Sequence, residues 1–262
     1  MRKKVAACCA LLGLFALLIV VSWWLSTTAI SRWQASHLRW NYAYHTLFPI
    51  LPLLGLALLR ARAATYGLSL KGWRLDARVG VYLAIPLIAF PLLAEALFGD
   101  LAVKPSVARF GLGNALVFQI IFVGFFEELL FRGFFQGEFN RVFGRPFTFG
   151  STRFGFGLFV TALLFGIAHL LNPFNPLRGG YSLDWVMFGS SAAFALIAGL
   201  IRERTGGLIA VALFHFGYGM FPKLFVVGPV SGSGMLLSWL VALALIAWLL
   251  FKMEELPATQ TA

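Results

Sequence analysis

Residues 114–135 read NALVFQIIFVGFFEELLFRGFF, an apolar run whose only ionisable residues are Glu127, Glu128 and Arg132. About 20 consecutive apolar residues are enough for a helix that crosses the hydrocarbon core of a bilayer. Charged side chains inside such a helix are costly and usually mark a functional site. This stretch therefore predicts a membrane-spanning helix with chemistry built into it.

The composition of the whole chain agrees with a membrane protein. Hydrophobic residues make up 60% of the sequence and charged residues 12%, whereas a typical soluble domain has about 25% charged residues. The net charge of +11 comes from 21 Lys and Arg against 10 Asp and Glu. Because these basic residues lie between apolar segments, we expect them to orient the chain in the bilayer and expect no nucleic-acid partner.

The predicted fold is all-α, a polytopic transmembrane helix bundle that forms a single membrane domain of residues 1–262. About eight spans are expected, at residues 5–25, 44–59, 79–98, 114–135, 154–171, 185–201, 207–221 and 235–251. The first follows three basic residues and is predicted to be an uncleaved signal anchor. Most Lys and Arg residues then fall on the side that holds both termini, which predicts that both termini are cytoplasmic.

The two adjacent carboxylates of the fourth span are expected to play different parts. Glu128 and Arg132 are one helical turn apart and can form an ion pair. Glu127 lies about 100° around the helix and cannot use the same arginine equally well. We therefore expect Arg132 to keep Glu128 ionised, and expect Glu127 to face a cavity where it can accept and donate protons.

Two histidines stand in other apolar spans. His169 lies one turn after Phe165 in the fifth span, and His215 lies in the seventh. Glu127, His169 and His215 could bind zinc and activate water. The same side chains could also work without metal, with the glutamate activating water and a histidine stabilising an oxyanion. The residues by themselves leave both possibilities open.

Taken together, these motifs resemble the CPBP family, the CAAX-processing and bacteriocin-processing (Abi-type) intramembrane endopeptidases. The resemblance rests on Glu-Glu-x-x-x-Arg at residues 127–132, Phe-x-x-x-His at residues 165–169, His215, and the turn at residues 198–207. It covers residues 115–220, which would form the catalytic core. The resemblance implies an intramembrane protease of the glutamic type, with zinc possible but not favoured as a cofactor.

Residue roles follow from the same resemblance. Glu127 would activate the attacking water, His169 would help to hold it, and Glu128 would support the site. His215 would belong to the oxyanion-stabilising element. Arg132, which would order the two carboxylates, and Phe165 would be supporting residues.

The sequence departs from the family pattern at Gly219. Many members have Asn or Asp at this position, four residues after the last histidine, and glycine has no side chain to donate. Tyr218 or Asn172 would be alternative donors. A second tension is depth, because in straight helices Glu127 and His169 would differ by roughly 10 Å in height. Tilt, or an extension of the fourth helix toward Glu138, would close this gap.

The expected partners are the lipid bilayer and a membrane-associated protein or peptide substrate, and the expected location is the bacterial inner membrane. Two other functions compete with peptide hydrolysis. A non-catalytic membrane scaffold or regulator that keeps the protease fold is favoured by Gly219. A transporter could use the carboxylates as a proton relay, but the halves of the chain show no repeat symmetry.

Overall fold

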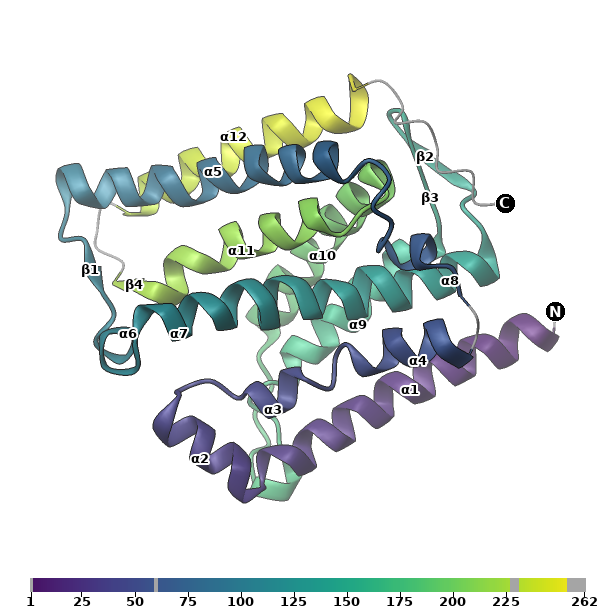
Figure 1. The fold of residues 1–262 in the computed structure, drawn as a ribbon, viewed down its shortest axis with the longest axis horizontal. Helices are drawn as coiled ribbons and strands as arrows, with labels where there is room; N and C mark the ends of the chain where they lie inside the picture. The colour runs from purple at the N-terminus through teal and green to yellow at the C-terminus, as the bar shows by residue number, and fades with distance from the viewer. Residues whose placement is uncertain (1, 59–60, 227–230, 254–262) are drawn as a thin grey trace.

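The structure, a computed structural model, describes residues 2–58, 61–226 and 231–253 as a bundle of helices packed side by side (Figure 1). Within these residues, five helices are long and apolar enough to cross a membrane. They are α1 (Arg2–Ser26), α5 (Trp73–Phe98), the continuous helix Leu112–Phe143, α10 (Trp185–Thr205) and α12 (Ser231–Phe251). The predicted all-α fold with membrane-spanning helices is therefore confirmed.

Three shorter apolar helices lie where the remaining spans were predicted. They are the segment Tyr42–Leu58, which comprises α3 (Tyr42–His45) and α4 (Ile50–Leu58), then α9 (Phe156–Leu170), and the first part of α11 (Ile209–Leu224). The count of eight spans and the cytoplasmic position of both termini stay predictions.

Short elements connect the long helices. The helical ones are α2 (Ala29–His37), η1 (Ala63–Tyr66), α6 (Pro105–Phe110) and η4 (Pro176–Arg178). Two small antiparallel sheets pair β1 (Ala102–Val103) with β4 (Phe225–Val226) and β2 (Phe147–Phe149) with β3 (Thr152–Phe154). These sheets lie at opposite ends of the bundle (Figure 1).

The helix Leu112–Phe143 contains the only long π-helical stretches in the described part of the chain. It begins with α7 (Leu112–Val117), continues through η2 (Phe118–Glu127) and η3 (Leu129–Phe135), both π-helical, and ends with α8 (Gln136–Phe143). The sequence pattern predicted a regular α-helix here. π-Helical turns are rare and occur frequently at functional sites, and these two stretches carry the paired carboxylates.

Helix α11 lies between α5 and the helix Leu112–Phe143 (Figure 1), and small residues bring the backbones close. A Cβ atom added at Gly217 would lie 3.0 Å from the Cα atom of Ala84, and one added at Gly80 would lie 2.8 Å from the Cα atom of Ala210. Glycine at helix crossings allows this close approach in membrane proteins. The contact fixes α11 against α5 on both sides of His215.

Replacing Gly217 with valine should push α11 away from α5 and displace His215, which lies half a turn away. Overpacking of this kind costs about 1–3 kcal/mol of folding stability, so thermal unfolding in detergent should shift to lower temperature. Gly113→Val is the matched control, since a Cβ atom there meets nothing within 4 Å. Equal unfolding temperatures for the two variants would contradict this role for Gly217.

A polar network joins the end of α8 to the end of α10. The Glu203 carboxylate accepts hydrogen bonds from Gln136 (2.8 Å), from Asn140 and from Arg145 (2.7 Å). Arg145 lies just beyond α8, so these contacts hold the helix in place beyond residue 135, where the predicted span ends. This explains why the fourth helix extends to Phe143.

The start of α11 is held by a carboxylate from a different helix. Asp76, near the start of α5, accepts hydrogen bonds from the backbone N–H groups of Ile209 (2.8 Å) and Ala210 (3.2 Å). A carboxylate at this place satisfies free N–H groups and complements the helix dipole. The helix that carries His215 is thus fixed at its beginning as well as along its length.

Candidate active site

Glu128 lies at the centre of a buried charge network. Its side chain is fully buried, and its two oxygens have different partners. Oε2 lies 3.1 Å from Nε of Arg132, and Oε1 lies 2.7 Å from Nδ1 of His215. The predicted ion pair with Arg132 is confirmed, whereas the contact with His215 could not be read from the sequence. Glu128 therefore acts as the anion that joins the fourth helix to α11.

Arg132 is packed between aromatic rings. Its guanidinium carbon lies 4.3 Å from the ring centre of Phe165 and 5.6 Å from that of Phe194. Nη1 and Nη2 have no hydrogen-bond partner within the described residues. Ring faces attract a guanidinium group by cation–π interaction, so Phe165 supports the ion pair from the side. The predicted supporting residues Arg132 and Phe165 are thus in direct contact.

Glu127 faces a histidine that the sequence analysis did not single out. Oε1 of Glu127 lies 3.3 Å from Nε2 of His45, which is the last residue of α3. Nδ1 of His45 lies 3.0 Å from the backbone oxygen of Asn41. A carbonyl oxygen can only accept, so Nδ1 carries a proton. Nε2 is therefore the ring atom that faces the Glu127 carboxylate.

His169 is held in place by its own helix. Its Nδ1 lies 2.9 Å from the backbone oxygen of Phe165, one turn earlier on α9. Nδ1 therefore donates, and the neutral ring keeps Nε2 as an acceptor. His169 and His215 both interact electrostatically with Glu127. The helix that carries Glu127 continues to Phe143, so it has the extension beyond residue 135 that the sequence analysis considered.

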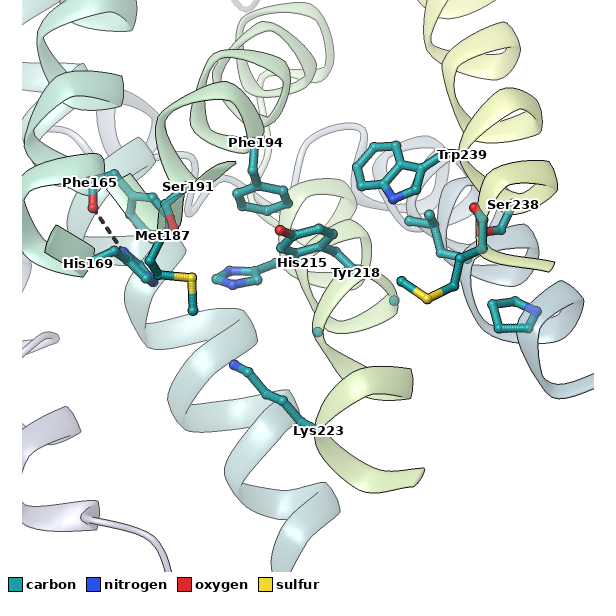
Figure 2. Close-up of a pocket in the computed structure, with 15 residues that line it drawn as sticks. Phe165, His169, Met187, Ser191, Phe194, His215, Tyr218, Lys223, Ser238 and Trp239 are labelled. Atoms are coloured by element: carbon teal, nitrogen blue, oxygen red, sulfur yellow. Dashed lines mark hydrogen bonds between the residues drawn. The ribbon is translucent and has the colours of Figure 1, made fainter. Parts of the chain in front are cut away.

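A cavity of about 260 Å³ opens beside these side chains. Figure 2 shows His169 and His215 on two sides of the same space, with the Met187 side chain between them. The remaining walls are mostly apolar and include Leu87, Pro91, Phe194, Met235 and Trp239. Glu127 itself does not line this cavity. Its side chain is 11% exposed.

The two alternative donors predicted for the missing Asn or Asp are in different places. Tyr218 lines the cavity and its ring stacks on Phe194 at 4.8 Å. Asn172 lines a second cavity, of about 190 Å³, which is bounded by Tyr44 and residues of α1. Gly219 lines the main cavity and leaves it open. Of the two, only Tyr218 is therefore placed to act in the cavity with His169 and His215.

The predicted set Glu127, His169 and His215 does not form a metal-binding cluster in this structure. Among the residues that the structure describes, no group of three or more His, Cys, Asp or Glu side chains is arranged to hold a metal ion. The Nδ1 atoms of both histidines contact protein oxygens, and one Glu127 oxygen faces His45.

His45 could have been found by the criterion that selected the other two histidines. It is an ionisable residue within a predicted apolar span, residues 44–59. That span is short and interrupted by Pro49 and Pro52, which weakened its signal as a helix. In the structure α3 ends before these prolines, and its last residue, His45, contacts Glu127.

Comparison with known proteins gives one family. Residues 111–221 match the family model described as Type II CAAX prenyl endopeptidase Rce1-like. This range runs from the start of the Glu127 helix into α11 and contains Glu127, Glu128, Arg132, His169 and His215, but not His45. The family resemblance predicted from the motifs is confirmed. No curated protein and no solved structure matches the chain.

Proposed function

Because residues 111–221 carry an Rce1-like CAAX endopeptidase sequence, we propose that this protein is an intramembrane endopeptidase that uses glutamate-activated water. Its catalytic core would be residues 115–220 of a single membrane domain. The substrate is a membrane-associated protein or peptide, and the enzyme works in the bacterial inner membrane.

One observation carries this proposal: the two carboxylates have opposite surroundings. Glu128 is fully buried between Arg132 and His215, and it does not line the cavity. Glu127 contacts His45 and interacts electrostatically with His169 and His215. Neighbouring carboxylates in environments of this kind divide the acid and base roles between them. Glu127 is the group that can exchange protons.

The proposed mechanism uses Glu127 together with the Nε2 atoms of His169 and His215. Glu127 takes a proton from the attacking water, which Nε2 of His169 helps to hold. His215 contacts the Glu128 carboxylate through Nδ1, and the protonated form of its ring would donate from Nε2 to the oxyanion that forms. Glu127 then passes its proton to the amine that leaves. Each step uses a side chain at the cavity or next to it.

We propose a mechanism without zinc, and activation of the water by zinc is the alternative chemistry. Metal analysis of the purified protein, combined with activity before and after chelation, distinguishes the two. A stoichiometric metal ion whose removal stops processing would contradict the glutamic mechanism and leave the peptidase function in place.

A non-catalytic scaffold is the second candidate function, and Gly219 is the observation that favours it. The loss of one oxyanion donor slows catalysis about 10²–10³-fold. A scaffold would keep its cellular effect after Glu127 is replaced. A protease would lose it.

The test is quantitative proteomics of membrane fractions from cells that carry the wild-type chain or the Glu127→Ala variant. We expect at least one membrane-associated protein to accumulate uncleaved in the variant. Asp100→Ala is the matched control, since Asp100 is an exposed carboxylate away from the cavity. Unchanged cleavage products in Glu127→Ala would reject the proposed function, and the accumulated protein would otherwise identify the substrate.

Replacing His45 with glutamine should lower turnover and change its pH dependence. Glutamine can still donate a hydrogen bond to Glu127, but its carboxamide cannot take up or release a proton. We expect a smaller loss than the about 10²–10⁴-fold that a general acid–base residue contributes, together with the loss of one step from the pH profile. His37→Gln, on the exposed α2, is the control. A uniform loss at every pH would show that His45 is only structural.

A further inference from the structure

Lys223 is a cation at the cavity without an anionic partner in contact. It lies near the end of α11, and it is the one lysine or arginine among the described residues that line the cavity. Figure 2 shows its amine turned toward the side of the cavity that holds His169 and His215. No carboxylate of the described chain lies within ion-pair distance of it. The acid with which it interacts electrostatically is Glu127.

A second polar side chain meets Lys223 at Gly219. Gln119, on η2, is 2% exposed, and its Nε2 has no hydrogen-bond partner within the described residues. A Cβ atom added at Gly219 would lie 3.7 Å from Nζ of Lys223 and 3.8 Å from Oε1 of Gln119. Two polar groups from different helices therefore border the space that Gly219 leaves open.

The chemistry of this space is that of a site for an anion. An ammonium group in apolar surroundings is costly unless an opposite charge pairs with it. A carboxamide can turn to offer either its oxygen or its N–H₂ group, depending on its partner. Lys223 and Gln119 can thus donate to the two oxygens of one carboxylate. The neighbouring walls, Leu87, Pro91, Met235 and Trp239, suit an apolar group attached to it.

We propose that Lys223 and Gln119 form a binding site for a carboxylate of the peptide substrate, in the space that Gly219 leaves open at the cavity lined by His169 and His215. The proposal rests on the proposed peptidase function for the identity of the ligand. The carboxylate is the C-terminus of the chain or an acidic side chain near the cleaved bond. In either case the site accounts for Lys223 at this cavity, next to Gly219, which has no side chain.

Binding can be measured without cleavage. The full-length protein with Glu127→Ala is titrated in detergent with N-acetyl-Leu-Leu as the free acid, with the same peptide as the amide, and with N-acetyl-Glu-Leu amide. Tryptophan fluorescence reports binding, since Trp239 lines the cavity. We expect the free acid to bind about 10- to 100-fold more tightly than the amide, as for hydrogen bonds to a charged group. The glutamyl amide distinguishes a side-chain carboxylate from a C-terminal one.

Lys223→Met should remove the preference for the acid, Gln119→Leu should reduce it, and Lys223→Arg should keep most of it. Lys71→Met, at an exposed position, is the control and should bind like the parent. Circular dichroism and unfolding temperature show whether each variant is folded. Equal affinities for acid and amide, a preference that survives Lys223→Met in a folded protein, or no binding of any peptide would overturn the proposal. Unchanged cleavage in Glu127→Ala cells would instead reject the peptidase function, and it would leave a measured acid preference intact.

Discussion

Replacing Glu127 with glutamine should lower the rate of substrate processing by at least about 10²–10⁴-fold, the contribution of one general acid–base group. Glutamine has nearly the same shape and can still meet His45, but it cannot take a proton from water. The protein should therefore insert and unfold as the wild type does. The measurement is the rate of cleavage of the substrate found by proteomics, with purified protein in bilayers.

Glu128→Gln provides the contrast for this prediction. It removes the anion between Arg132 and His215, so we expect it to lower both the rate and the stability of the fold. If Glu127→Gln also lowered stability strongly, Glu127 would be a structural residue. If it processed substrate at the wild-type rate, the division of roles between the two carboxylates would be wrong.

Replacing Arg132 with methionine should cost about 3–5 kcal/mol of folding stability, the usual result of leaving one member of a buried ion pair alone. The expected loss is large because Glu128 is fully buried. In the described structure its partners within ion-pair distance are Arg132 and His215, so without Arg132 only His215 is left. Unfolding in mixed detergent micelles measures it. Arg178→Met, at an exposed arginine on η4, should cost little.

A double variant tests the same ion pair from the other side. Adding Glu128→Gln to Arg132→Met removes the carboxylate that was left without its partner. We therefore expect the double variant to lose less stability than the sum of the two single losses. Additive losses, or a loss below about 1 kcal/mol for Arg132→Met, as for an exposed pair, would show that the ion pair does not hold the site together.

Local spacing predicted the parts of the site that lie on one helix. Glu128 and Arg132 are one turn apart, and that separation brings them together even though the turns between them are π-helical. The contact of Glu128 with His215 depends on how α11 crosses the fourth helix. Gly217 and the Asp76 cap set this crossing. Neither residue allows the crossing angle to be predicted from the sequence. The pairing could therefore be seen only in the structure.

Two further features escaped the sequence for different reasons. His45 stands at the start of a short apolar run with two prolines, so its segment looked like a weak span rather than the carrier of a functional residue. Lys223 looked like an ordinary loop charge just past the predicted end of its span at residue 221. Helix α11 continues to Leu224, and this extra turn brings the ammonium group back to the cavity.

The position of His45 has a consequence for how the protein is made. It lies outside the 111–221 segment, so that segment alone lacks the contact between Glu127 and His45. During synthesis α3 is made before Glu127, and this contact can form only after the later helix docks beside α3. A chain divided between α4 and α5 and expressed as two fragments should accordingly regain activity only when both fragments are present. The proposed active site would then form only when the helices assemble, and an incomplete chain in the membrane would have no proteolytic activity.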